Sequence, residues 1–323
     1  MPISLQKLRQ SAKSAVLVAC GLTSLARRRM EGGAVLTFHG LCQDGQSTGV
    51  LDASLHLPVS VFRAVCRHLK VSYQVMPLLE MTAAVQAGRP LPSRAVALSF
   101  DDGLASNYHL GFPVLRELGL PATVFLATGF LDGTHPLWFQ EVDRALKARG
   151  ADAAELATCL AHLKTLPDAV MRGEVRKLVE GCEAAEAEVA RPMSWQQARE
   201  MQASGLVHFG GHTHTHPILS QCSVEQQAEE IRVCRDRMTE ELGKAPSLFA
   251  YTNGGPGDFT PQTQELLAAH GFQAAFSMMP ARLAAGLTTH ALPRYGNPTS
   301  VLEAEATASG AFELVKQWRG VRR

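Results

Sequence analysis

Short apolar segments alternate with longer amphipathic segments over most of this chain, and this alternation constrains the fold more than any other feature. The apolar runs have the length of buried strands, and apolar residues recur between them at the three- and four-residue spacing of a helix. A regular strand–helix order predicts a mostly parallel sheet covered by helices. The expected strands are residues 33–39, 95–100, 121–127, 206–210, 247–251, 272–278 and 290–295.

About seven parallel strands in one run favour a closed or nearly closed (β/α) barrel over an open sheet. Residues 138–190 interrupt the rhythm, because they are rich in Ala and Glu and helical in pattern, so we expect a helical insertion there. Ser194, Ser223 and Thr260 are placed to begin helices. Four glycines are placed to end helices: Gly119, Gly205, Gly243 and Gly271.

The N-terminal segment, residues 1–32, differs from the rest, and residues 33–323 are expected to form one domain. Its apolar run, residues 14–26, is flanked by basic residues and is short for a bilayer span. A helix packed on the domain is the favoured interpretation. Peripheral membrane contact through residues 1–30, a membrane anchor and a secretory signal are the alternatives.

Composition excludes several classes of protein. The 323 residues carry a formal net charge of +1, which gives no electrostatic reason to expect a nucleic-acid partner. The seven cysteines are scattered without a CxxC pair, which argues against a disulfide framework or a cysteine zinc site. Reduced thiols favour a cytoplasmic protein, and association with a membrane or export is the alternative.

Ionisable side chains follow four of the expected strands. Asp101 and Asp102 follow residues 95–100, and the histidine run "GGHTHTHP" follows residues 206–210. His39 and Arg294 come at the ends of two others. Because the carboxyl ends of the strands of a parallel barrel meet at one rim, we expect these groups to lie together. An acidic pair after a strand also commonly caps the next helix, which is the alternative for Asp101 and Asp102.

An aspartate and two histidines form a donor set suited to a hydrolytic metal site. One divalent ion is expected, Zn²⁺ first, although Co²⁺, Ni²⁺ or Fe²⁺ would accept the same ligands. Such an ion lowers the pKa of its bound water, which then acts as the nucleophile. Adjacent aspartates can divide the work, because one binds the metal while the other accepts the proton of the water.

Two of these motifs resemble a known family. "LSFDDG" and "HTHTHP" are similar to the first and second motifs of the polysaccharide deacetylases with a NodB-like domain, carbohydrate esterase family 4. The similarity extends over roughly residues 33–315 and includes "FAYTNGG" and "LPRYGNPTSVLEAEATASG". The resemblance implies a distorted (β/α) barrel and metal-dependent removal of N-acetyl, or sometimes O-acetyl, groups from sugars.

The resemblance also implies roles for the charged residues. Asp101 corresponds to the catalytic base and Asp102 to the metal ligand of the first motif. In the second motif the ligands are two histidines four residues apart, which selects His212 and His216 and leaves His214 between them. The pairs that include His214 remain alternatives, because alternate residues of an extended segment share a face.

This chain departs from the family pattern in two places. The third motif usually carries an arginine where this chain has Ala250, and Arg294 in "LPRYG" resembles the replacement found in a subgroup. A cation at that place would lower the pKa of Asp101. The second departure concerns the general acid, which in many members is a histidine of a late "LxH" motif, whereas the late segment of this chain ends in Arg294. The segment "VLTFHG" resembles circularly permuted members, which include poly-N-acetylglucosamine deacetylases, in which the corresponding strand comes first. His39 is therefore the expected general acid, with His290 as the alternative.

Three further residues are expected to contact the substrate. Backbone N–H groups around Asn253 could face a developing oxyanion, Tyr251 lies in the same motif, and Trp138 could stack on a sugar ring or pack the insertion onto the barrel. The predicted function is hydrolysis of N-acetyl groups on an amino-sugar glycan or glycoconjugate. A non-catalytic glycan-binding protein and an amidohydrolase acting on a non-sugar amide are the alternatives.

Overall fold

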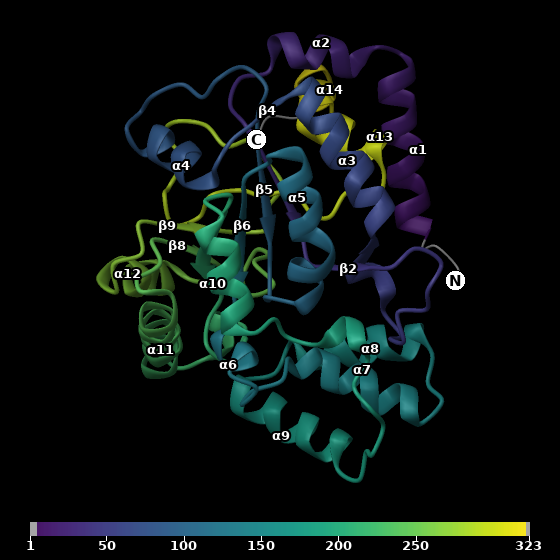
Figure 1. Ribbon diagram of the computed structural model, residues 1–323, viewed down its shortest axis with the longest axis vertical. Coiled ribbons are helices and arrows are strands. Elements are labelled where there is room, and N and C mark those ends of the chain that lie inside the picture. Colours follow the sequence, from purple (N-terminus) through teal and green to yellow (C-terminus); the bar gives the residue numbers. More distant parts are fainter. Residues whose placement is uncertain (1–4, 321–323) are drawn as a thin grey trace.

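A computed structural model describes residues 5–320 of the chain, and its centre is a curled seven-stranded sheet (Figure 1). Neighbouring strands run parallel in the order β1-β5-β6-β7-β8-β9, and β4 pairs with the start of β5. The strands are β1 Ala34–Phe38, β4 Gln74–Val75, β5 Ala95–Phe100, β6 Ala122–Leu126, β7 Val207–Gly211, β8 Leu248–Ala250 and β9 Ala274–Phe276.

Helices cover the outside of this sheet. In Figure 1, α4, α11 and α12 lie on the left, while α1, α3 and α13 lie on the right. The helices outside the insertion are α1 Leu5–Ala19, α2 Leu22–Arg29, α3 Val59–Ser72, α4 Leu78–Gln86, α5 Phe112–Leu118, α6 Thr128–Leu131, α10 Trp195–Ala203, α11 Val224–Leu242, α12 Pro261–Ala269, α13 Val301–Ala308 and α14 Ala311–Trp318.

The helix boundaries follow the predicted signals. Side chains of Ser194, Ser223 and Thr260 accept hydrogen bonds from the backbone N–H groups three residues later, at the start of α10, α11 and α12. Gly119 and Gly243 end α5 and α11 with φ of 63° and 72°, a conformation that glycine adopts without strain. These local interactions are encoded within a few residues, which is why the sequence alone predicts them.

The expected strand at residues 290–295 is wrong, because no strand forms there. The segment instead lies between β9 and β1 and bridges them. Ser277 donates its N–H to the Leu292 carbonyl at 2.8 Å, and Tyr295 donates its N–H to the Val35 carbonyl at 2.9 Å. These two bridges link the edges of the sheet, so the predicted distorted (β/α) barrel is confirmed although its last member is irregular.

Residues 138–190 hold three α-helices, α7 Trp138–Ala148, α8 Ala153–Leu163 and α9 Asp168–Val179, and lie at the bottom of Figure 1. Apolar faces of the three helices meet in a small core of their own, formed by Trp138, Val142, Leu156, Leu163, Met171 and Val175. The helical spacing of the apolar residues in this Ala- and Glu-rich segment therefore gives each helix one apolar face, which packs against the other two helices.

A second, two-stranded parallel sheet was not predicted. Strand β2, Gly40–Cys42, follows β1 after a single residue, His39, and pairs with β3, His56–Pro58. The register places Gly40 opposite His56. Strands of three residues carry too few side chains for a periodic pattern, so sequence analysis had no signal for this pair.

The N-terminal helices α1 and α2 pack against α13 and α14, which is the arrangement favoured above. Their shared core contains Leu17 and Ala26 from the first pair and Ala306, Ala311 and Leu314 from the second. In the part of the chain that the structure describes, we find no helix with the length and apolar content needed to cross a bilayer.

Candidate active site

The carboxyl ends of β5 and β7 bring an aspartate and two histidines together. Oδ1 of Asp102 lies 3.4 Å from Nε2 of His212 and 3.3 Å from Nε2 of His216. Each of the three residues offers one ligand atom, and these atoms lie within 4.8 Å of one another. All three side chains are buried. The structure thus assembles the three residues that the sequence predicts as metal ligands.

The hydrogen bonds of this cluster fit a divalent cation. Nδ1 of His212 lies 2.7 Å from the Ala250 carbonyl, so this nitrogen carries the proton and Nε2 is left with a free lone pair. Oδ2 of Asp102 is buried and has no hydrogen-bond donor among the described residues. A buried carboxylate oxygen without a partner is costly. Two imidazoles and a carboxylate are ligands that Zn²⁺ and similar ions accept.

Asp101 forms a separate ion pair beside this cluster. Arg294 Nη1 and Nη2 lie 2.7 Å and 2.9 Å from the two carboxylate oxygens of Asp101, an arrangement with two parallel hydrogen bonds. Burial alone would raise the pKa of Asp101, but the charge and hydrogen bonds of Arg294 outweigh burial and lower it. Asp101 is therefore held as a carboxylate that can accept a proton.

The pocket around Arg294 explains why a buried arginine is tolerated. The Arg294 side chain is fully buried, and its Nε donates to the Ser277 carbonyl at 3.3 Å. The guanidinium carbon lies 5.2 Å from the centre of the Phe125 ring, within range of a cation–π contact. These partners, which come from β6 and the segment after β9, orient the guanidinium toward Asp101 and make Arg294 a positioning residue.

Backbone strain concentrates in the loops of this site. Five non-glycine residues of the described chain have positive φ angles, and four of them lie here: Asp102 (75°), Thr213 (67°), His216 (60°) and Asn253 (59°). A β-branched residue such as Thr213 rarely adopts this conformation. Strain of about 1–3 kcal/mol per residue persists only where the surrounding structure stabilises it, and such positions cluster at functional sites.

Glu230, on α11, holds the loop of residues 212–216, here called the histidine loop, in this conformation. One of its carboxylate oxygens accepts hydrogen bonds from the backbone N–H groups of His214 and Thr215, both at 2.8 Å. The other accepts from the Thr215 hydroxyl at 2.6 Å. Glu230 is buried, so its carboxylate satisfies donors that water does not reach.

Replacing Glu230 with Ala is expected to leave these donors unsatisfied and to lower the free energy of unfolding by about 3 kcal/mol. The loop also carries His212 and His216, so metal affinity should fall by about 10- to 100-fold, as for other residues that orient ligands. Chemical denaturation and metal titration would measure the two effects. Glu229→Ala is the matched control, because Glu229 is exposed and, among residues 5–320, pairs only with its helix neighbour Arg232. Equal effects of both variants would contradict this role.

The insertion also contacts the histidine loop. Arg172, on α9, donates to the Thr215 carbonyl at 3.1 Å, and Trp138 donates its indole N–H to the His216 carbonyl at 3.2 Å. The Trp138 side chain is only 3 % exposed. Of the two roles considered for Trp138, the structure favours packing over stacking on a sugar, because the ring is buried in the core of the insertion and its indole N–H supports the backbone of His216.

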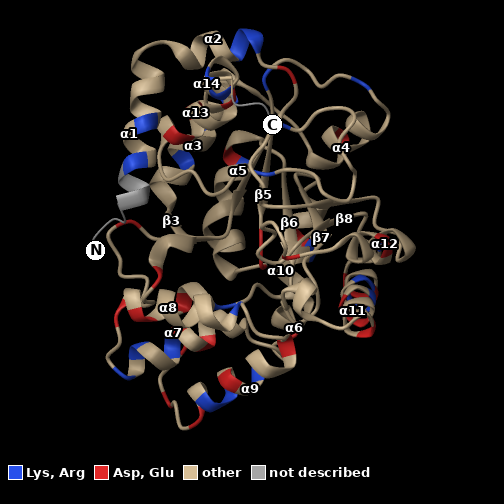
Figure 2. Ribbon diagram, turned by 180° about the vertical axis from the view of Figure 1, so that it is seen from behind, with Lys and Arg blue, Asp and Glu red and all other residues tan. Residues whose placement is uncertain are grey.

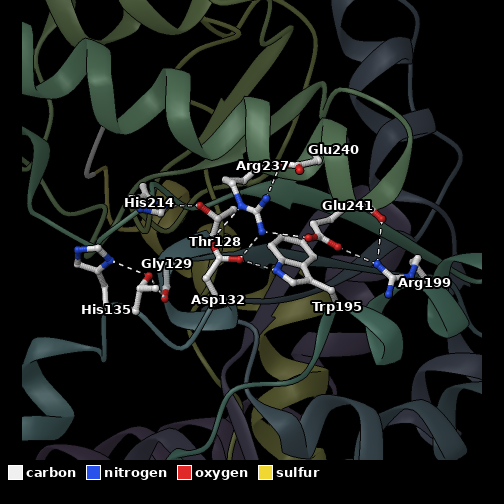
Figure 3. Close-up of polar contacts among 11 residues, drawn as sticks. Thr128, Gly129, Asp132, His135, Trp195, Arg199, His214, Arg237, Glu240 and Glu241 are labelled. Atoms are coloured by element: carbon white, nitrogen blue, oxygen red, sulfur yellow. Dashed lines mark hydrogen bonds and ion pairs between the residues drawn. The ribbon is translucent and has the colours of Figure 1, made fainter.

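His214 points away from the other two histidines. Its Nδ1 lies 2.8 Å from the Thr128 hydroxyl, and its ring lies 5.1 Å from that of His135 (Figure 3). The structure thus brings His212 and His216, and not His214, to Asp102. Thr128 belongs to α6, and α6 is held in place by Asp132, which accepts hydrogen bonds from Trp195 and Arg237.

A cavity of about 290 Å³ opens in front of the cluster. Asp101, Asp102, His212, His216, His39 and Asn253 line its polar side. Further polar side chains and a set of apolar ones complete the lining: Asp52, His56, Gln140, Asp143 and Lys164, and Leu104, Leu156, Leu160 and Met278 among others. A pocket that combines apolar walls with converging polar groups is the usual form of a small-ligand site.

Tyr251 is not among the residues that line this cavity, contrary to prediction. The side chain is 1 % exposed, its hydroxyl donates to the His290 carbonyl at 2.7 Å, and its ring stacks on Phe259 at 3.9 Å. Tyr251 lies next to β8 in a position whose side chain faces the helices rather than the cavity. Asn253, two residues later, does reach the cavity.

His39 and His290 occupy different environments. His39 lines the cavity, and its buried Nδ1 has no hydrogen-bond partner among the described residues. His290 does not line the cavity, and its Nε2 lies 2.9 Å from the Phe272 carbonyl. The placement of the two side chains favours His39 as the group that can reach a substrate.

Sequence analysis missed His56, which lines the same cavity as His39. The β2–β3 register brings it there, and only glycine fits opposite, because a Cβ on Gly40 would lie 2.2 Å from His56 Nδ1. Burial, and then the neighbouring His39, lower the pKa of His56 to about 4, so this imidazole is neutral at pH 7. A lone histidine far from any motif gave no signal for this position.

The family model described as "Polysaccharide deacetylase" matches residues 88–275, more than half of the chain, and includes both aspartates and both histidines of the cluster. The chain belongs to the polysaccharide deacetylase family. His39 and Arg294 lie outside the matched residues.

Individual relatives match over different lengths. The chain is 42 % identical over 50 residues to the poly-β-1,6-N-acetyl-D-glucosamine N-deacetylase of Escherichia coli K12, a segment that covers 16 % of this chain and 7 % of that protein. Two solved structures share the fold. The deacetylase PplD of Streptococcus pyogenes has a TM-score of 0.61 at 16 % identity, covering 86 % of this chain and 98 % of PplD. IcaB of Ammonifex degensii has a TM-score of 0.61 at 21 % identity, covering 87 % and 98 %.

Proposed function

We propose that this protein is a metal-dependent hydrolase that removes N-acetyl groups from an amino sugar of a glycan or glycoconjugate. One observation carries the proposal: the Asp102–His212–His216 cluster and Asp101, which pairs with the buried Arg294 behind it, lie side by side on the wall of one cavity. Membership of the family and the name of the E. coli relative support it, although the match spans only 7 % of that relative.

Asp102, His212 and His216 would hold the divalent ion, for which Zn²⁺ is the first choice and Co²⁺, Ni²⁺ or Fe²⁺ the alternatives. When bound, the ion would polarise the acetyl carbonyl and lower the pKa of a water molecule. The ring proton on Nδ1 of His212, shared with the Ala250 carbonyl, keeps Nε2 directed at this position.

Asp101 would accept the proton of the attacking water, because Arg294 keeps it ionised and orients both of its oxygens. A bond then forms between the water oxygen and the acetyl carbon. As the C–N bond breaks, His39 would donate a proton to the departing amine, which leaves acetate and a free amino sugar. Asn253 lines the same cavity and is assigned to substrate binding.

Release of acetate tests this proposal directly. The protein, loaded in turn with Zn²⁺, Co²⁺, Ni²⁺ or Fe²⁺, would be incubated with β-1,4- and β-1,6-linked N-acetylglucosamine oligomers and with O-acetylated sugars. We expect acetate and free amine to appear in equal amounts from at least one N-acetylated oligomer. Bound metal without acetate from any acetylated sugar would contradict the proposal, and would favour glycan binding without hydrolysis or a non-sugar amide as substrate.

A further inference from the structure

Charge is distributed very unevenly along this nearly neutral chain. Residues 1–30 and 314–323 together carry ten Lys and Arg and no Asp or Glu, whereas the rest of the chain carries 21 basic and 30 acidic residues. The two basic segments meet in the fold, because α2 and α14 share a core in which Ala26 and Leu314 are buried. Both helices lie at the end of the molecule opposite the insertion (Figures 1 and 2).

Arginines from two separate segments converge at this end. Arg27 and Arg28, at the end of α2, and Arg94, just before β5, line a surface hollow of about 540 Å³ together with Ser24 and Ser93. Arg27 is partly neutralised by Glu305, whose carboxylate lies 3.4 Å from its Nε. The side chains of Arg28 and Arg94 are exposed, and within the described part of the chain neither has a carboxylate within 4.0 Å.

Exposed apolar side chains accompany these cations. Val71, at the end of α3, is 86 % exposed and precedes Ser72, whose carbonyl accepts a hydrogen bond from Arg94 at 3.5 Å. Trp318, the last residue of α14, is 56 % exposed between the exposed Lys316 and Arg319. Indole rings and aliphatic groups beside basic side chains suit the headgroup region of a bilayer, where each part finds a favourable environment.

We propose that this end of the protein docks on an anionic lipid surface. The basic end is defined by Arg28, Arg29, Arg94, Lys316 and Arg319, with Val71 and Trp318 as its apolar members. Charge complementarity selects the partner, since unpaired arginines are attracted to acidic headgroups. Nucleic acid is a less suitable partner than an anionic membrane, because the remainder of the chain is acidic and the exposed Val71 would make no favourable contact with a phosphate backbone.

The position of the basic end leaves the active-site cavity free. The cavity is lined by Leu156 and Leu160 of α8, in the insertion at the bottom of Figure 1, whereas α2 lies at the top. A protein docked through α2 and α14 would therefore present the cavity away from the bilayer. This docking does not depend on the proposed deacetylation, and each can fail without the other.

Sedimentation with vesicles tests the proposal. The full chain would be mixed with vesicles of phosphatidylcholine alone and with vesicles that also contain phosphatidylglycerol, at low and high salt. We expect binding only to the anionic vesicles and weakening as salt rises. The triple variant Arg28→Gln, Arg29→Gln, Arg94→Gln should lower the partition coefficient by roughly 100-fold, because each arginine contributes about five-fold near an anionic surface.

A charge-matched control separates docking from net charge. The variant Arg176→Gln, Lys177→Gln, Lys244→Gln removes three exposed charges from other faces and should keep full binding. Trp318→Ser should remove the part of the binding that resists high salt. Equal binding to neutral vesicles, an equal loss in the control variant, or capture of an oligonucleotide in preference to anionic vesicles would overturn the proposal. Thermal unfolding and acetate release from a soluble oligomer would show that the variants remain folded.

Discussion

Asp101→Asn is expected to keep the bound metal and to lower the rate of acetate release by about 100- to 10,000-fold, the usual contribution of a positioned general base. Asn has nearly the shape of Asp and can still accept a hydrogen bond from Arg294, so the cavity should keep its form. It cannot take the proton of a water molecule. The rate with saturating substrate, measured together with the metal content of the same sample, would show both results.

A matched control is needed because Asp101→Asn also leaves a buried arginine without its counter-charge. Asp132→Asn makes the same chemical change in another ion pair, which does not line the cavity. Asp132 accepts two hydrogen bonds from Arg237, of 2.7 Å and 3.0 Å. We expect this control to lower the free energy of unfolding and to leave turnover within a few-fold. If Asp101→Asn retained nearly full activity, another group would have to be the base.

The second large effect is the loss of metal affinity expected when a histidine of the cluster is replaced. His212→Ala or His216→Ala should lower metal affinity well beyond 100-fold, because even a residue that only orients a ligand contributes about 10- to 100-fold. His214→Ala should leave metal affinity almost unchanged, since its ring contacts Thr128 and not Asp102. It should cost about 1 kcal/mol of stability through the lost hydrogen bond.

Elemental analysis after dialysis against a weak chelator would separate the three variants. The comparison is well controlled, because all three substitutions are the same and fall within five residues of one loop. Loss of metal in His214→Ala as complete as in His216→Ala would show that the loop adopts a different conformation around the ion.

Much of the barrel could be predicted because its signals are local. Strands β1, β5, β6, β7, β8 and β9 appear as apolar runs, and α10, α11 and α12 begin at the serines and threonine that cap them. Residues 290–295 have the composition of a strand, but between β9 and β1 they form only the two isolated bridges Phe276–Leu292 and Leu36–Tyr295. Pairing depends on neighbours distant in sequence, which periodicity does not record.

The candidate site likewise has a part that local sequence motifs predict and a part that depends on tertiary packing. The two adjacent aspartates lie in one short motif and the two histidines four residues apart lie in another. Asp101, Asp102, His212 and His216 could therefore be predicted as site residues from the sequence. The direction of a side chain depends on its packing partners, and here the sequence was less informative. Trp138 and Tyr251 are buried behind the loops rather than in the cavity, while His56 enters it through the register of β2 and β3.

The amino-acid sequence by itself determined the alternation of strands and helices, the caps, the order of the motifs and the segregation of charge to the two ends of the chain. Each of these depends on residues that are close together along the chain. Tertiary structure alone decided which histidines face Asp102, that Arg294 meets Asp101 across 193 positions of sequence, and that α2, α14 and Arg94 form one basic end. Such contacts arise only when the sheet curls and its helices pack, because burial and hydrogen bonding then select one orientation for each side chain.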